Sequence, residues 1–417
     1  MTDAIRKKCE WNVKWYPRYA FLSDAYFWLP IFFLYFSEVL TLDEVLLVEM
    51  VYYLGVYFME VPSGWFSDRF GRRITLLVAA VILAVAYGMI FVGGSFVIFA
   101  VAQFLKAAGI SFKSGTETAF HFDSLKVLGR EDEFAAREAK VSRNRFLGGA
   151  LAALIGGLVA IWSLQLAYLV ACIAAVGMLF LVVRFVEPPV EEPEIHANPF
   201  REFARCLGYL RQPILLCILC YFVLMTILNH VPYEFFQSYI EFSLADLPWA
   251  QPGTPLVSGM HVTLTLLVAS FFGASSIAIR NRIGLWWTLL LATGIQSVII
   301  GAMGWILSPL VVLLLLARSV PRALMAPVIN ATVTGRVARK HRATYLSMQS
   351  LAGRLAFAGM LLILSSVVPS DESATWATVS EVLQLSFKVA GVGFVLILII
   401  ALIRFRSDGT GQQPAPE

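Results

Sequence analysis

The chain has 417 residues, of which 59% are hydrophobic and 14% are charged, with a formal net charge of +4 and a mean hydropathy of +0.75. Soluble domains are only about half apolar and about one quarter charged. A soluble fold of this size has no interior that could hide so much apolar surface, so lipid must surround most of the chain. The composition therefore favours an integral membrane protein and predicts no nucleic-acid partner.

The chain opens with a polar stretch, residues 1–18, which has no cleavage signal and is predicted to be retained as a cytoplasmic leader. A helix that crosses a bilayer needs about 20 mainly apolar residues. Twelve such runs follow, and we expect a membrane-spanning helix near each of them: 19–40, 44–66, 74–93, 95–116, 140–161, 164–186, 212–234, 257–279, 285–306, 309–332, 343–368 and 383–404.

A polar insertion, residues 187–211, divides these runs into six and six. Its stretch FREFARCLGYL has the pattern of a short amphipathic helix on the membrane surface. Residues 405–417 are predicted to form a disordered cytoplasmic tail. The predicted domains are therefore an N-terminal six-helix bundle, 19–186, and a C-terminal six-helix bundle, 212–404.

The distribution of positive charge predicts the orientation. Most of the 32 Lys and Arg residues fall in the leader, the tail and the loops that share their side. The opposite connections carry acids such as Asp43, Glu44 and Asp246, and Lys388 alone among the basic residues lies near that side. Because Lys and Arg gather in cytoplasmic loops, we expect a multi-pass protein with both termini in the cytoplasm.

The loop after the second run reads GWFSDRFGRR, residues 64–73, and fits G-x-x-x-D-R-x-G-R-R at every defined position. It resembles the signature loop of the major facilitator superfamily. One glycine is expected to let two helices approach closely and the other to permit the turn. The aspartate is expected to face the positive end of a neighbouring helix, and the arginines to pair with acids. The expected gating motif comprises Gly64, Asp68, Arg69, Gly71, Arg72, Arg73 and Asp123.

A fainter copy of this loop, Asn281-Arg282-Ile283-Gly284, follows 213 residues after Asp68-Arg69-Phe70-Gly71. Lys106 and Arg318 are separated by 212 residues, which is nearly the same offset. The resemblance covers nearly the whole chain and implies an all-α membrane protein with twelve transmembrane helices, built as two six-helix bundles related by pseudo-two-fold symmetry. It is nearest to bacterial drug-efflux members, which implies location in the bacterial inner membrane.

The fifth run departs from the superfamily's antiporters, which often have a Gly-Pro pair there. It carries two rows of small residues instead, and such rows are suited to close helix packing. This departure argues against antiport. The rows are Gly148/Ala152/Gly156 and Gly149/Ala153/Gly157.

Three of the basic residues inside predicted spans are candidates for binding the substrate. Lys106 and Arg318 lie near mid-depth, and Arg322 lies one turn after Arg318 on the same helical face. Each would cost about 2.5–3.5 kcal/mol if it faced lipid, so each must face a polar cavity or a partner. In the superfamily, helices 4 and 10 border the central cavity, which makes these residues candidates for binding an anionic substrate group. The alternative is internal pairing with Asp24, Glu49 or Glu117.

Proton coupling requires a titratable acid within the membrane. Asp24 in the first run is the leading candidate, and Glu117 and Glu234 follow, although each can equally have a structural role. Lys113 precedes Glu117 by four residues and could simply pair with it on one helical face. Asp123 is expected to join a cytoplasmic charge network with the arginines of the signature loop.

The predicted function is secondary active transport of a small organic solute by alternating access, with proton-coupled efflux as the leading direction. One alternative is proton- or potential-coupled uptake of an organic anion or siderophore-like compound. Another is a non-transporting receptor or assembly factor on the same fold. No nucleotide-binding, esterase or zinc-protease motif occurs, so we expect no enzyme activity, cofactor or metal. The expected partners are the substrate, protons and the bilayer, and the protein is expected to be a monomer.

Five cysteines are scattered without the spacing of a disulfide framework or a zinc site. Cys217 and Cys220 lie in an apolar run, where they are expected to be two packed thiols of one helix.

Overall fold

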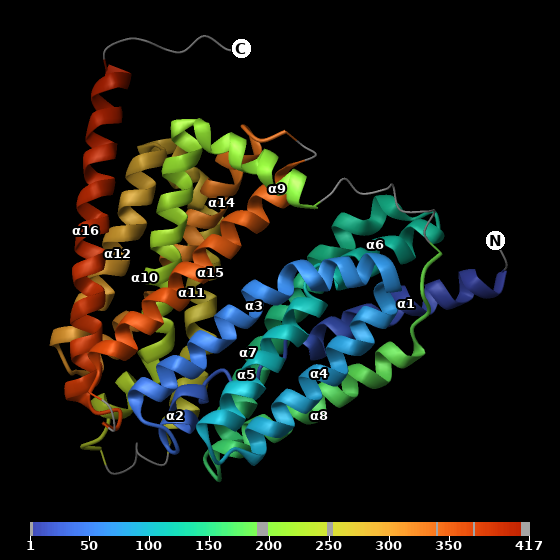
Figure 1. Ribbon diagram of the computed structural model, residues 1–417, viewed down its shortest axis with the longest axis horizontal. Helices are drawn as coiled ribbons and strands as arrows, with labels where there is room; N and C mark the ends of the chain where they lie inside the picture. The colour runs from blue at the N-terminus through green and yellow to red at the C-terminus, as the bar shows by residue number, and fades with distance from the viewer. Residues whose placement is uncertain (1–2, 190–198, 248–252, 339–340, 370–371, 410–417) are drawn as a thin grey trace. The chain divides into compact units, whose positions relative to one another are not determined.

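The computed structural model describes residues 3–189, 199–247, 253–338, 341–369 and 372–409, and all regular elements within these ranges are helical (Figure 1). Among these residues, ten helices are long and apolar enough to cross a membrane. The chain divides into two compact units. Unit 1 comprises residues 1–196, 249–263 and 361–371, and unit 2 comprises residues 197–248, 264–360 and 372–417.

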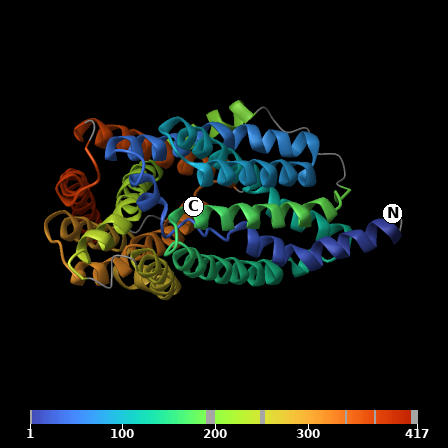
Figure 2. The ribbon, with the colours of Figure 1, turned by 90° about the horizontal axis from the view of Figure 1, so that it is seen from below.

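Unit 1 is built from the first eight α-helices. In it α5 packs against α3 and α4, α8 packs against α4, and α1 packs against α6, α7 and α8 (Figure 2). The helices are α1 (Asp3–Ser23), α2 (Phe32–Ser37), α3 (Leu42–Phe70), α4 (Arg72–Val92), α5 (Phe96–Lys113), α6 (Thr116–Val127), α7 (Phe134–Val159) and α8 (Leu164–Arg184), with a 3₁₀ turn, η1 (Glu131–Glu133), before α7.

Unit 2 contains most of the remaining helices. Here α12 packs against α14 and α16, and α10 packs against α12 and α16. The elements are α9 (Pro199–Gly208), η2 (Tyr209–Arg211), α10 (Pro213–Ser243), α11 (Thr254–Ile283), α12 (Leu285–Trp305), α13 (Pro309–Leu314), η3 (Leu315–Ala317), α14 (Val320–Thr334), α15 (Arg342–Val367) and α16 (Trp376–Gly409).

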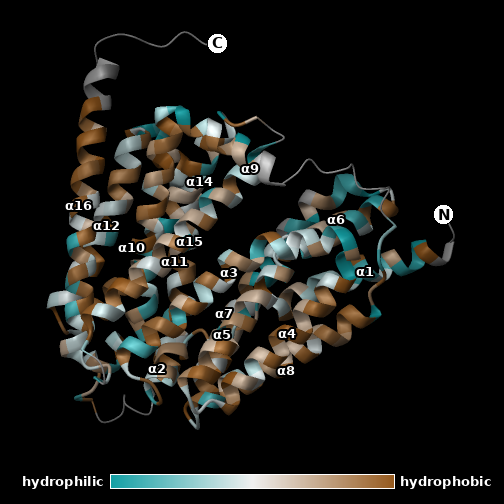
Figure 3. Cartoon of the chain, viewed as in Figure 1, coloured by the Kyte–Doolittle hydropathy of each residue, from teal (hydrophilic) through white to brown (hydrophobic). Residues whose placement is uncertain are grey.

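Two of the twelve expected spans have no counterpart among these ten helices of the described residues. The first is broken, because α1 ends at Ser23 and residues 24–31 form turns before α2 begins. Pro30 lies in this break, where its missing backbone N–H costs no helical hydrogen bond. The fifth is a single helix, α7, whose first half is rich in Lys and Arg. Figure 3 shows that hydrophilic residues are also concentrated around α1 and α6.

The segments outside the spans follow the expectation in part. The stretch predicted to be a short amphipathic helix forms α9, and the predicted leader and the start of the first run form one helix, α1. The last helix, α16, begins at Trp376, seven residues before the expected position. Part of the predicted linker, 190–198, and most of the predicted tail, 410–417, lie outside the described residues.

The local geometry of the signature loop recurs at the offset of 213 residues. Gly71 and Gly284 both have positive φ, at +94° and +86°, and each separates two long helices. The hydroxyl of Thr75 donates to the carbonyl oxygen of Gly71 over 2.7 Å, and that of Thr288 donates to Gly284 over 2.8 Å. The helices that follow, α4 and α12, have 21 residues each.

The glycine row on α7 packs against the broken first span. A Cβ at Gly148 would lie 2.9 Å from the carbonyl oxygen of Phe21, and a Cβ at Gly156 would overlap the carbonyl oxygen of Phe27. Because these neighbours are backbone atoms, they cannot move aside as the end of a side chain could. The small residues therefore hold the turns of residues 24–31 directly against α7.

Gly156→Ala is expected to destabilise the protein by about 1–3 kcal/mol, since its added methyl group would press on the Phe27 backbone. The measurement is thermal unfolding of the purified protein in detergent. Gly149→Ala is the matched control on the same helix, because its Cβ would lie 3.7 Å from the carbonyl oxygen of Asp24, an ordinary contact distance. Equal melting temperatures for the two variants would contradict the packing role of Gly156.

Candidate functional site

A carboxylate that follows α8 in the chain binds the signature loop. α3 ends at Phe70 and α4 begins at Arg72, with Gly71 between them. Glu187, which follows α8, accepts hydrogen bonds from the backbone N–H groups of Arg72 and Arg73, each over 2.7 Å. A helix begins with unpaired N–H groups and a partial positive charge, so this carboxylate both satisfies and neutralises the start of α4.

Gly71 is required here for two reasons. Its φ of +94° is disfavoured for other residues, and a Cβ would lie 2.8 Å from the carboxyl carbon of Glu187. Nothing in the sequence singled out Glu187, which is the first of several acids in the predicted linker. Its role depends on the end of α8 being brought next to the start of α4.

The charged side chains of the loop pair within unit 1. Arg72 donates to Asp68 over 2.7 Å and to the hydroxyl of Ser67 over 2.9 Å, and its Nε lies 3.7 Å from Asp123. The predicted contact between Asp123 and the arginines is therefore present at Arg72. Glu187 binds the start of α4, and the expectation that Asp68 faces the positive end of a neighbouring helix stays a prediction.

The other members of the motif have separate surroundings. Arg73 donates to the carbonyl oxygen of Val183 over 2.9 Å, and the guanidinium of Arg69 lies 5.8 Å from the ring centroid of Trp65. A Cβ at Gly64 would meet no described atom within 4 Å, so the close helix approach expected there is not made within unit 1.

A cluster of four charges lies where the first and fourth expected spans are broken. Lys113, the last residue of α5, donates to the carboxylate of Asp24 and to the carbonyl oxygen of Ser23, each over 2.7 Å. Arg145 of α7 donates to Asp24 over 2.9 Å and to Glu117 over 2.7 Å. Two acids and two bases balance one another, so the cluster can lie in a weakly polar interior without net charge. We call Asp24, Lys113, Glu117 and Arg145 the charge cluster.

The breaks in the helices create the charge cluster. α5 ends at Lys113, Gly115 has a φ of +74°, and α6 begins at Thr116. Lys113 and Glu117 are therefore not on successive turns of one helix, and their i,i+4 pairing would require a continuous helix. Lys113 pairs with Asp24 instead, while Glu117 pairs with Arg145.

Two tyrosines complete this arrangement. The hydroxyl of Tyr26 lies 3.2 Å from the ammonium of Lys113, and that of Tyr16 lies 3.3 Å from Arg145. The sequence singled out Asp24 and Glu117, but Arg145 had no feature to distinguish it from the other basic residues of its loop. Only the folding of α7 against α1 and α6 shows that it bridges both acids.

Lys106 lies in a second buried environment in unit 1. Its side chain is 1% exposed, and its ammonium lies 4.1 Å from the ring centroid of Trp28 and 4.6 Å from that of Tyr52. Glu49 accepts a hydrogen bond of 2.6 Å from Gln103, and the charge of Lys106 acts on this carboxylate. Aromatic faces attract cations, so the two rings stabilise the ammonium of Lys106. Groups of unit 1 therefore surround this residue.

Arg318 has a comparable environment in unit 2, at the interruption between η3 and α14. Its guanidinium carbon lies 4.0 Å from the ring centroid of Phe236, and it donates to the hydroxyl of Thr265 over 2.8 Å. Arg322 is exposed, and Glu234 is buried in α10. These residues belong to unit 2 and Lys106 to unit 1, so the predicted substrate site that would join them stays a prediction.

A family model described as Major Facilitator Superfamily matches residues 19–361. The chain belongs to this superfamily. It is accordingly a multi-pass membrane protein with the fold of a transporter. No curated protein sequence gives a significant match.

Solved structures of other superfamily-type transporters are similar to this superfamily member. The nucleoside transporter NupG has a TM-score of 0.75 at 11% identity, and the match covers 94% of this chain and 99% of the NupG chain. The POT family transporter PepTSo has a TM-score of 0.70 at 14% identity, with 97% and 99% covered. A D-xylose-proton symporter has a TM-score of 0.66 at 16% identity, with 94% and 96% covered. Such identities show the fold alone, and they do not support the drug-efflux subgroup expected from the sequence.

Arg145→Gln is expected to lower the free energy of unfolding by about 3–5 kcal/mol, because it leaves the buried carboxylate of Glu117 without its cation. Adding Glu117→Gln should restore part of this loss, and unfolding in detergent measures both effects. Arg137→Gln is the control on the same helix, since its pair with Glu133 is partly exposed and should contribute at most about 1 kcal/mol. Additive losses in the double variant would contradict the direct coupling of Arg145 and Glu117.

Proposed function

We propose that this superfamily member is a proton-coupled secondary active transporter of a small organic solute. The observation that supports this most directly is the charge cluster at two helix breaks. In transporters, discontinuous membrane helices form sites for substrates and coupling ions. Acids inside a membrane region are costly and commonly mark proton pathways. A cluster that combines both features is suited to coupling a proton to a conformational change.

The ties within the charge cluster suggest how a proton would act. Asp24 joins the end of α1 to Lys113 of α5 and to Arg145 of α7, while Glu117 joins α6 to α7. A proton on Asp24 would remove its negative charge and weaken two of these ties at once. The helix pieces around the break could then rearrange, and the proton would favour the conformation in which the ties are already open.

We also propose the architecture in which this happens. Twelve spans would form two six-helix bundles, 19–186 and 212–404, related by pseudo-two-fold symmetry and joined by a linker at 187–211. Both termini would lie in the cytoplasm of a bacterial cell, with the protein a monomer in the inner membrane. The recurrence of the Gly71 turn at Gly284 supports this duplication. The signature loop would be the gate, with Arg72 exchanging partners between states.

The substrate class that we propose is an organic anion held between the bundles by Lys106 and Arg318, with Arg322 at the edge of the site. Both of the first two cations are buried beside aromatic rings, so an anion that enters would meet a charge already removed from water. Export is the proposed direction, and uptake of an organic anion is the alternative. A pH gradient of either sign, imposed on oriented proteoliposomes, separates them.

Asp24→Asn is expected to reduce solute accumulation driven by a pH gradient to the level of protein-free liposomes, while solute exchange without a gradient persists. The amide keeps the size of the side chain but cannot carry the proton. The panel should include organic anions and lipophilic cations. It should also include nucleosides, peptides and xylose, because the similar structures are described as a nucleoside transporter, a peptide transporter and a D-xylose-proton symporter. Asp246→Asn, at an exposed acid, is the matched control. Unchanged pH-driven accumulation in Asp24→Asn would remove Asp24 as the coupling residue.

The same assay tests the anion site with Lys106→Ala and Arg318→Ala. If an anion is the substrate, both variants should lose exchange as well as gradient-driven accumulation, because they lose binding rather than coupling. If both variants transport an anion as well as the wild type does, the proposed anion site is wrong. Absence of flux for every compound in the panel would favour a non-transporting receptor or assembly factor.

A further inference from the structure

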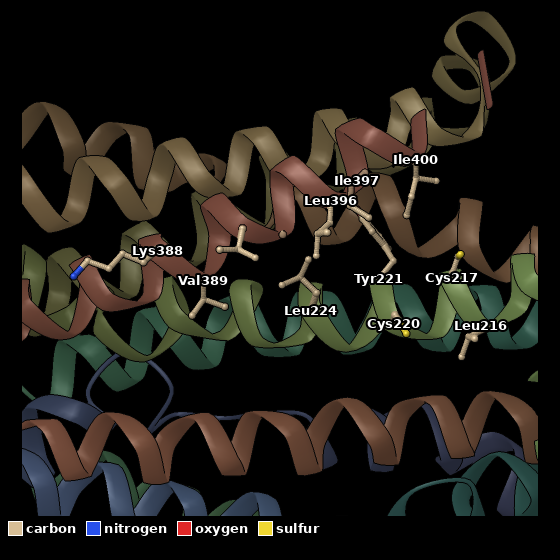
Figure 4. Close-up of a pocket in the computed structure, with 12 residues that line it drawn as sticks. Leu216, Cys217, Cys220, Tyr221, Leu224, Lys388, Val389, Leu396, Ile397 and Ile400 are labelled. Atoms are coloured by element: carbon tan, nitrogen blue, oxygen red, sulfur yellow. The ribbon is translucent and has the colours of Figure 1, made fainter. Parts of the chain in front are cut away.

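A long apolar groove lies between α10 and α16 of unit 2 (Figure 4). Its volume is about 650 Å³, within the range of about 300–1,000 Å³ that is usual for ligand pockets. Tyr221, Gly393 and Ile397 are buried at its base, whereas Cys220 and Leu396 are exposed along it. The groove therefore opens on the surface of two helices that are apolar enough to cross a membrane.

Lys388 lies at one end of this groove and is the charged residue among those that line it in the described part of the chain. Its side chain is exposed, and Figure 4 shows its amine directed away from Leu216 at the far end. Side chains of a helix lean toward its N-terminus, so the amine is directed toward the start of α16. The neighbouring Phe387 packs against Gly301, one turn before α12 ends at Trp305, so Lys388 lies close to the level where α12 ends. An exposed lysine in a span is costly unless it reaches the nearer membrane surface.

The groove matches one leaflet of a bilayer in length. From Lys388 to Ile400 the lining follows twelve residues of α16, which rise about 18 Å. Half of the hydrocarbon core of a bilayer is about 15 Å thick. A lipid chain that starts beside the lysine would therefore be accommodated along its length, with its headgroup at the charged end.

We propose that the groove binds an anionic phospholipid, with an acyl chain between α10 and α16 and the phosphate paired with Lys388. The apolar lining fits a hydrocarbon chain, and the lysine supplies the complementary charge at the end where a headgroup would lie. A polar solute would find few hydrogen-bonding groups along the groove. The site is on unit 2 and is independent of the charge cluster of unit 1, so its test does not depend on the proposed transport function.

Native mass spectrometry of the full chain, with phosphatidylglycerol and phosphatidylcholine of equal chain length, tests the proposal. The wild type should retain the anionic lipid preferentially. Lys388→Gln should weaken this retention about fivefold, which corresponds to the roughly 1 kcal/mol expected for one basic residue near an anionic lipid. Lys388→Arg should keep the preference. Cys220→Trp, which places a bulky side chain in the open part of the groove, should lower the retention of both lipids.

A second readout uses the thiol of Cys220. Phosphatidylglycerol should slow its alkylation by a maleimide in the wild type but not in Lys388→Gln, while the alkylation of Cys172 in unit 1 should not change. Equal retention of the two lipids by the wild type, or no effect of Lys388→Gln, would overturn the proposal. So would protection of Cys220 by the water-soluble organic anions of the transport panel in the absence of lipid, because the groove would then admit polar solutes.

Discussion

Charge held inside a lipid-embedded fold must be neutralised by its own neighbours, and unit 1 depends on this constraint. Arg145 supplies one guanidinium to two carboxylates, Asp24 and Glu117, while Lys113 supplies the second cation. Each contact joins a different pair of chain segments, so the pairing also determines how the pieces meet. The breaks after Ser23 and Lys113 are tolerated because side chains at the broken ends find partners there. Removal of Arg145 would leave the buried carboxylate of Glu117 without its cation.

The same principle applies at the start of α4, where the charge is the partial positive charge of a helix N-terminus. The N–H groups at its start are paired with the carboxylate of Glu187, and Gly71 provides both the conformation and the space for that contact. Arg72 then links the loop to Asp68 and Asp123 through its side chain. The signature loop is thus a small network in which Glu187 binds the backbone N–H groups, while Asp68 and Asp123 neutralise the side chain of Arg72. Before α12 the corresponding glycine turn and threonine hydrogen bond recur, but Leu285 and Trp286 stand at the positions of Arg72 and Arg73.

The two buried cations of the predicted substrate site share a chemical environment. Lys106 lies beside Trp28 and Tyr52, and Arg318 beside Phe236. An aromatic face stabilises a cation without removing its ability to pair with an anion, because the ring supplies no formal charge. The charge of Lys106 also acts on the carboxylate of Glu49, so its surroundings include an internal acid as well as two rings. Asp24 differs, since its two oxygens are already engaged by cations and a proton can alter that engagement.

The sequence by itself determined the membrane class, the superfamily and the approximate position of most helices, because apolar runs and the GWFSDRFGRR loop are local features of the chain. It also singled out Asp24 and Glu117 as acids of interest, because an acidic residue within an apolar run is recognisable whatever its place in the folded protein. Tertiary structure decided which charges meet: Arg145 and Glu187 had no local signature, and their roles arise from segments more than 100 residues apart. It also decided that the first expected span breaks at Ser23, which hydropathy cannot show because it averages over the break. Hydropathy and motifs depend on neighbours along the chain, whereas the neutralisation of buried charge depends on neighbours in space.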